Sequence, residues 1–138
     1  MVFTNNSQDN NPASKIFTTW YQKLYHTSLA AVAAPQAYDA VIAAALAMEA
    51  AHSFKGPAVN AKISYVSNPP GTPVYSFAQG VALLKQGKKI NYEGVGSTVD
   101  FNAHHSVTGP FGVYKFTKRG TIVPVANVTS IMLENFTK

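Results

Sequence analysis

The sequence predicts an α/β fold of about four helices followed by a small antiparallel sheet of about three or four strands. Two patterns carry this prediction. Apolar residues recur at helical spacing through roughly the first two thirds of the chain, and single-residue alternation replaces that spacing around residues 99–101 and 113–117. Because the predicted helices and strands do not alternate along the chain, a parallel sheet is not expected.

Each predicted helix has a recognisable start. Asn11 is a good N-cap for the first helix, and Pro12 suits its first helical position. Pro35 opens the second helix, which is rich in alanine and so permits close approach by another element. Ser76 and Gln79 have capping-box spacing before the fourth helix. The helices are predicted over about residues 12–27, 35–52, 57–66 and 77–86.

The predicted strands lie after residue 96. Val99 and Phe101 alternate with Asp100, and a polar turn over residues 102–106 leads to a second strand that ends near residue 117. Gly120 precedes a third strand over residues 121–126, and the apolar tail over residues 131–136 is a candidate last strand. Regular structure is not expected over residues 68–73, where three prolines fall close together, because proline removes a backbone donor and fixes φ.

Composition bounds the domain count and the partners. The chain has 138 residues, enough for a single domain over 12–138 after a polar N-terminal segment, 1–11. Its net charge of +5 reflects only six acidic residues against eleven scattered basic ones. Nucleic-acid binding would need a dense basic stripe, so no nucleic-acid partner is expected. The absence of cysteine excludes disulfides, thiolate metal ligands and a cysteine nucleophile.

No catalytic, metal or cofactor site is expected. His104 and His105 are adjacent in a polar turn without clustered ligands, which favours a solvated turn over a metal site. Asp39 and Glu49 lie about 15 Å apart along one predicted helix, too far to act as an acid/base pair. Asp39 is expected in the first helical turn, where the helix dipole favours an acid. The serines lack a nucleophile-elbow motif, so hydrolysis has little support.

The sequence also bears on location. Residues 1–14 lack a basic start and an apolar run, so any export signal or anchor is expected upstream of this chain. The apolar stretch over residues 37–51 is interrupted by two acids and is too short to cross a bilayer, which predicts a soluble chain. Three glycosylation sequons together with the few acids favour exposure to an external, acidic medium. The sequons begin at Asn5, Asn127 and Asn135.

Five passages follow one another in order between residues 12 and 126. They are the aromatic and basic helix over 17–25, Ala-Tyr-Asp-Ala-Val over 37–41, Ser-Asn-Pro-Pro-Gly over 67–71, the Lys-Gly and Tyr-Glu-Gly passage over 83–94, and the hairpin over 96–116. In this order they resemble the C-terminal part of the extracellular solute-binding proteins of ABC importers. The branch they resemble is the leucine/isoleucine/valine-binding family, whose fold is the type I periplasmic-binding-protein fold.

The resemblance implies a function and a partial fold. The family has two α/β lobes with the ligand held in the cleft between them. By resemblance, this chain is part of a receptor for branched-chain or other small amino acids, and captures its ligand without catalysis. ABC-importer membrane subunits would then be its partners, and its location would be periplasmic or at the cell surface. A fragment, a truncated gene product and one component of an assembly all remain open.

The resemblance also points to ligand-binding residues. In the family, the residues just before the Ala-Tyr-Asp-Ala passage approach the cleft, and a helix N-terminus offers free N–H donors to a carboxylate. The plainer alternative is that these residues only start a buried helix, with Tyr38 in the core or at a hinge. The candidates are Ala33, Ala34, Pro35 and Gln36.

A second functional hypothesis is a self-associating structural or interaction domain without ligand binding of its own. Two helices present apolar faces that lie against a parallel sheet in the intact family. Left uncovered here, these faces would form a patch larger than soluble monomers usually expose, so a homo-oligomer is expected. The faces comprise Ile16, Phe17, Trp20 and Leu24, and Val41, Ile42, Ala45 and Leu46.

Overall fold

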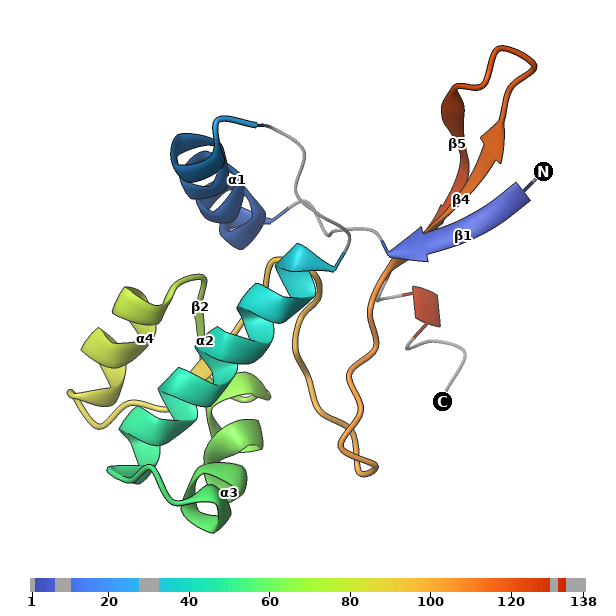
Figure 1. The fold of residues 1–138 in the computed structure, drawn as a ribbon. Coiled ribbons are helices and arrows are strands. Elements are labelled where there is room, and N and C mark those ends of the chain that lie inside the picture. Colours follow the sequence, from blue (N-terminus) through green and yellow to red (C-terminus); the bar gives the residue numbers. More distant parts are fainter. Residues whose placement is uncertain (1, 7–10, 28–32, 130–131, 134–138) are drawn as a thin grey trace.

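The computed structural model describes residues 2–6, 11–27, 33–129 and 132–133 (Figure 1). Within these residues it has four helices and five strands, and it confirms the predicted α/β class. Each helix lies within about two residues of its predicted position. The helices are α1 (Pro12–Tyr25), α2 (Ala34–Ala51), α3 (Gly56–Ser67) and α4 (Phe77–Leu84).

Local sequence explains the helix starts. Asn11 caps α1 by accepting a 2.9 Å hydrogen bond from the Ser14 N–H, and the Ser14 hydroxyl completes the capping box. The Ser76 hydroxyl accepts from the Gln79 N–H at the start of α4. α2 differs, since its N-cap is Ala33 with a left-handed φ of 65° and no side-chain cap. The start of α2 is therefore held by tertiary contacts rather than by a capping side chain.

The expectation of no parallel strand pairing was wrong. β2 (Thr72–Val74) and β3 (Ile90–Tyr92) form a parallel pair, and α4 connects them. β2 contains Pro73, which the ladder tolerates because its bonds use the Thr72 N–H to the Lys89 carbonyl and the Glu93 N–H to the Val74 carbonyl. Strands of three residues are too short for a periodic signal, which is why the sequence pattern missed them.

The antiparallel sheet is present, but its membership differs from the prediction. β4 (Phe111–Phe116) pairs with β5 (Ile122–Val128) around the Gly120 turn, and β1 (Val2–Asn6) adds to the free edge of β4. The predicted strand at residues 99–101 is reduced to one bridge between Phe101 and Val107. Val99 has a φ of 58°, which no strand residue adopts, so the chain bends there instead of extending.

The prediction of a strand in the C-terminal tail was wrong for the two tail residues that the structure describes. Met132 and Leu133 are helical, and the Leu133 N–H bonds to the Thr129 carbonyl at 3.2 Å. The rest of that prediction, over residues 131 and 134–136, lies outside the described residues. Between the first two predicted helices, residues 28–32 lie outside the described residues, and Ala34 already belongs to α2.

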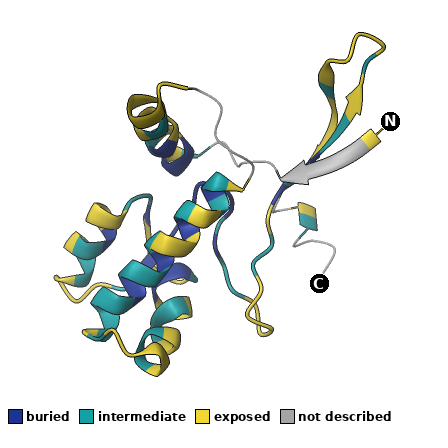
Figure 2. Cartoon of the chain, in the orientation of Figure 1, coloured by how far each residue is buried: buried dark blue, intermediate teal, exposed yellow. Residues whose placement is uncertain are grey.

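The main core lies between α2, α3, α4 and the β2–β3 pair (Figure 2). A second cluster joins α1 to the segment after β3 through Ala13, Phe17 and Val95. The β1–β4–β5 sheet stands apart from both clusters, and β5 is largely exposed (Figures 1 and 2). The fully buried members of the main core include Leu46, Ala47, Val66, Ile90 and Tyr92.

Candidate functional site

A buried carboxylate organises the region beside the start of α2. Asp39 is only 5% exposed, and its two oxygens accept three hydrogen bonds. Oδ1 accepts from the Tyr92 hydroxyl at 2.9 Å and from the Val95 N–H at 2.8 Å, while Oδ2 accepts from the Gly96 N–H at 2.7 Å. We call this set of three bonds the Asp39 clamp. It fixes the segment after β3 against α2.

The position of Asp39 corrects one prediction. α2 begins at Ala34 and has no acid in its first turn, so the helix dipole does not account for Asp39. The residue instead lies on the buried stripe of α2 that also carries Ala43 and Leu46. Asp39, Ala43 and Leu46 have the i, i+4, i+7 spacing of one helix face, and this spacing indicates that Asp39 is buried. A buried carboxylate requires hydrogen-bond donors nearby, so the spacing was a signal for the bonds observed here.

Two effects oppose each other at the Asp39 carboxyl. Burial raises its pKa above the ordinary value, and the hydrogen bonds from Val95, Gly96 and Tyr92 lower it; burial is the larger effect, so the pKa is raised. Burial and the neighbouring Asp39 charge also raise the pKa of the Tyr92 hydroxyl. Tyr92 therefore stays protonated and acts as a donor to the carboxylate.

A pocket of about 200 Å³ opens beside the Asp39 clamp. Its polar groups come from Gln36 and Asp39 on α2 and from Gly96 and Ser97 across from them. Gln36 packs closely on Gly96, where a Cβ would lie 3.0 Å from the Gln36 Nε2 atom. The Gln36 Oε1 atom is buried and has no hydrogen-bond partner among the described residues. The apolar wall consists of Ala40, Val99, Phe101 and Val107.

The four predicted ligand-binding residues lie in different surroundings. Gln36 lines the 200 Å³ pocket, whereas Ala34 lines a larger apolar groove. Ala33 is exposed at the N-cap, and Pro35 is buried. Of the four, only Gln36 therefore contributes a polar side chain to a pocket. Asp39, Gly96 and Ser97 also line it, and none of them was predicted to bind a ligand.

The larger groove, of about 480 Å³, lies between α1 and α2. Phe17 forms its floor and contacts Tyr38, with ring centroids 5.3 Å apart. Trp20 and Leu24 on its rim are 56% and 65% exposed, and the Lys23 ammonium lies 4.9 Å from the Trp20 ring centroid. We call this surface the aromatic groove. It includes three members of the predicted uncovered face of α1, of which Phe17 is buried and Trp20 and Leu24 are accessible.

Other candidates do not form a catalytic or metal centre. His104 and His105 lie in an exposed turn, as predicted, where the Asn102 Oδ1 atom accepts from the His104 and Ser106 N–H groups. Within the described ranges, no three side chains of histidine, cysteine, aspartate or glutamate gather as a metal site would need. The sequon residues Asn5 and Asn127 lie in β1 and β5, and Asn135 is outside the described ranges.

Comparison with known families assigns the chain. Residues 2–119, which are most of this chain, match the model of the receptor family ligand binding region. The chain belongs to this family. Its helices and small sheets are consistent with part of a type I periplasmic-binding-protein-like fold, and the family consists of ligand-binding receptors and binding proteins that are generally not catalytic. Searches of curated proteins and of solved structures gave no match.

The family membership also bears on location. Members of this family are typically extracellular or periplasmic. None of the described helices is both long and apolar enough to cross a membrane.

Proposed function

We propose that this chain is the part of a receptor that contacts a branched-chain or other small amino acid, captured without catalysis for an ABC importer. The observation that carries the proposal is the 200 Å³ pocket at the start of α2. It combines acceptor oxygens on one side with an apolar wall on the other. A small amphiphilic ligand needs both.

The polar side of this pocket favours an ammonium group. Within the described part of the chain, the Gln36 Oε1 atom is an acceptor without a partner, and the Asp39 carboxylate has used three of its about four acceptor positions. An amino acid offers three N–H donors on its ammonium group and an apolar side chain for the wall near Phe101. The free N–H groups expected at the start of α2 would suit the ligand's carboxylate.

The size of the pocket agrees with a ligand site that is shared between two lobes. Ligand pockets that enclose a small molecule usually measure about 300–1,000 Å³, and this one is smaller. A second lobe closing over the same ligand would supply the remaining contacts, as expected for cleft closure. Affinity of this chain alone for an amino acid should therefore be weak.

The proposal is tested by titrating the ¹⁵N-labelled chain with leucine, isoleucine and valine. Amide shifts are expected at Gln36, Gly96 and Ser97, far from saturation at millimolar ligand, with no measurable heat in calorimetry. The amine 3-methylbutylamine should shift the same signals, whereas 4-methylpentanoate, which lacks the ammonium group, should not. Gln36→Ala should remove the shifts, while Gln86→Ala, at an exposed position just after α4, should leave them unchanged.

Two results would contradict this proposal. Absence of shifts at the pocket up to the solubility limit of leucine would rule out an amino-acid contact surface here. Micromolar binding by a monomer would show that one lobe encloses the ligand, against the shared cleft.

The aromatic groove favours a second candidate function, self-association without ligand binding. Its rim exposes Trp20, Leu24 and Tyr25, and tryptophan and tyrosine are the side chains that most often dominate protein interfaces. A stable pair usually buries roughly 800 Å² on each partner, which would require the neighbouring exposed surface of α2 at Val41 as well. A second copy of the chain is the occupant this hypothesis commits to.

Trp20→Glu is expected to weaken such a dimer at least about ten-fold, because it places a charge in the middle of an apolar contact. Sedimentation velocity across micromolar concentrations measures this change. Phe54→Glu is the matched control, since Phe54 is equally apolar, 88% exposed and outside the groove. A folded wild-type monomer of about 15 kDa throughout the range would exclude self-association.

A further inference from the structure

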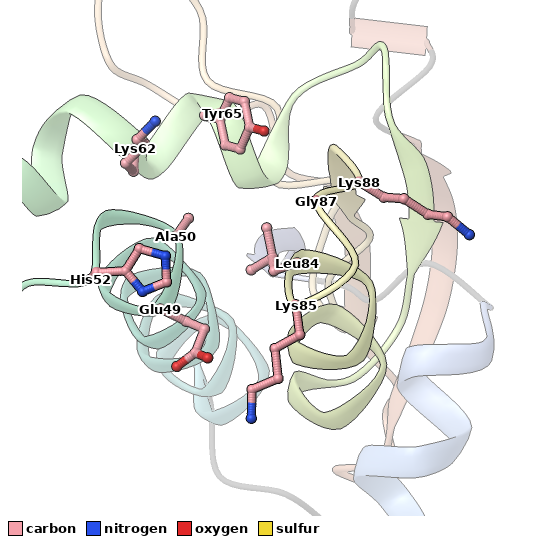
Figure 3. A pocket seen from close by; sticks show the side chains of 9 residues that line it. All are labelled: Glu49, Ala50, His52, Lys62, Tyr65, Leu84, Lys85, Gly87 and Lys88. Carbon is pink, nitrogen blue, oxygen red and sulfur yellow. The ribbon is translucent and has the colours of Figure 1, made fainter.

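A third cavity, of about 110 Å³, lies away from the proposed ligand pocket (Figure 3). It is bounded by the end of α2, one side of α3 and the end of α4. Its lining carries three lysines against one glutamate, beside one histidine and one tyrosine. The residues with polar side chains are Glu49, His52, Lys62, Tyr65, Lys85 and Lys88.

The lysines of this cavity lack acidic partners. Among the described residues, none of Lys62, Lys85 and Lys88 forms an ion pair. The Lys62 ammonium lies 4.6 Å from the centroid of the Tyr65 ring, and the Lys89 ammonium, just outside the lining, lies 5.8 Å from it. An aromatic face attracts a cation but leaves its charge uncompensated. The region therefore has an excess of positive charge.

Helix capping does not explain these lysines. At the end of α2, the His52 N–H bonds to the Glu49 carbonyl at 3.2 Å. At the end of α4, the Gln86 and Gly87 N–H groups bond to the Leu83 and Leu84 carbonyls at 3.0 and 2.9 Å. Backbone donors thus satisfy carbonyls that lysine side chains could otherwise bind. The ammonium groups remain available to an external ligand.

The lysines come from two sides of the cavity, so a bound ligand would have to draw their ammonium groups together (Figure 3). Lys62 and Tyr65 come from α3 on one side of the cavity, and Lys85 and Lys88 come from the segment that follows α4 on the other. In Figure 3 the three lysine side chains point in different directions, away from one another. Each has a flexible four-carbon stem, so its ammonium group can swing toward an anion.

We propose that this cavity binds a phosphate-sized oxyanion, with Lys62, Lys85 and Lys88 supplying the charge. A volume of 110 Å³ is about the room of four waters, enough for one tetrahedral group and too little for a nucleoside. The ligand is inorganic phosphate or the phosphoryl group of a larger molecule that remains outside. Glu49 opposes the anion and limits its affinity.

A lipid headgroup is one source of such a phosphoryl group. The loop between α2 and α3 carries Phe54, which is 88% exposed and lies two residues after His52 of the lining. An exposed aromatic side chain beside lysines suits the interface of an anionic bilayer. Free phosphate would make no use of Phe54. This difference separates the two sources.

The test uses the ¹⁵N-labelled chain titrated with sodium phosphate, against sodium chloride at matched ionic strength. Saturable shifts are expected at Tyr65, Gly87 and Lys88 with phosphate only. Lys62→Gln/Lys88→Gln should weaken binding at least about ten-fold. The control Lys115→Gln/Lys118→Gln removes the same charge from the exposed β4 hairpin and should leave the affinity unchanged. Glu49→Gln should strengthen binding.

Shifts that do not saturate would overturn the site. Phosphate binding that weakens equally in both double variants would also overturn it, because net charge alone would then explain the binding. Vesicles of phosphatidylglycerol and of phosphatidylcholine identify the source. Co-sedimentation with the anionic vesicles alone, lost in both Phe54→Ser and Lys62→Gln/Lys88→Gln, assigns a lipid headgroup. Phosphate binding without that pattern assigns a soluble phosphoryl ligand.

Discussion

Asp39→Ala is expected to lower the free energy of unfolding by about 2–4 kcal/mol. The substitution leaves the N–H groups of Val95 and Gly96 and the hydroxyl of Tyr92 without their acceptor, at buried positions. Each unsatisfied buried donor costs about 1–3 kcal/mol, and removal of a buried charge offsets part of that sum. Urea unfolding followed by circular dichroism measures the difference.

Glu49→Ala is the matched control for this prediction. It removes an acid from the same helix, at a half-buried position where no other described residue forms a hydrogen bond or ion pair with the carboxylate. Its cost should stay within about 0.5 kcal/mol. Equal losses in the two variants would show that the Asp39 clamp contributes nothing specific.

The pH dependence supplies a second readout of the same carboxylate. Because burial raises the Asp39 pKa above its ordinary value of 3.8, the folded chain keeps a proton that the unfolded chain has released. The stability from this group is therefore present below pH 3.8 and falls as the pH rises through the raised value. Relative to Asp39→Asn, the wild type should be more stable at about pH 3 than at about pH 7. The opposite slope would mean that the hydrogen bonds outweigh burial.

How far the sequence predicts this fold depends on how local each signal is. The helices were predicted closely because their caps and spacing lie within one turn, as at Asn11 and Ser76. β2 and β3 were missed because three residues cannot display a period, and their pairing is made across α4. β1 was missed for a related reason, since its partner β4 is about a hundred residues away and its own sequence is polar.

The candidate site was likewise predicted where its signals are local and missed where it depends on tertiary contacts. The start of α2 was predicted from Pro35, and Gln36 does line a pocket. The opposite wall at Gly96 and Ser97 could not be placed, because contacts between residues far apart in the sequence, such as the bond from Gly96 to Asp39, bring it to α2. The left-handed φ of Val99 likewise depends on this tertiary context, so local alternation predicted a strand where the chain bends.

Gly94→Ala is expected to destabilise the fold by about 2–4 kcal/mol, although alanine usually costs nothing in an open position. A Cβ at residue 94 would lie 2.5 Å from the Val99 Cγ2 atom and 2.6 Å from the Asp39 Oδ2 atom. Neither neighbour can retreat easily, since Val99 is buried and Asp39 is held by three hydrogen bonds. Gly56→Ala is the control, because its Cβ would meet nothing within 4 Å.

The double variant Asp39→Ala/Gly94→Ala tests whether the two losses share one cause. If Gly94→Ala acts by displacing the Asp39 carboxylate, then removing that carboxylate first leaves less for the new methyl group to disrupt. The double variant should therefore lose at least about 1 kcal/mol less than the sum of the single losses. Strict additivity would place the damage of Gly94→Ala at Val99 instead. In either case the close approach of Asp39 and Val99 to residue 94 is the reason for the expected loss.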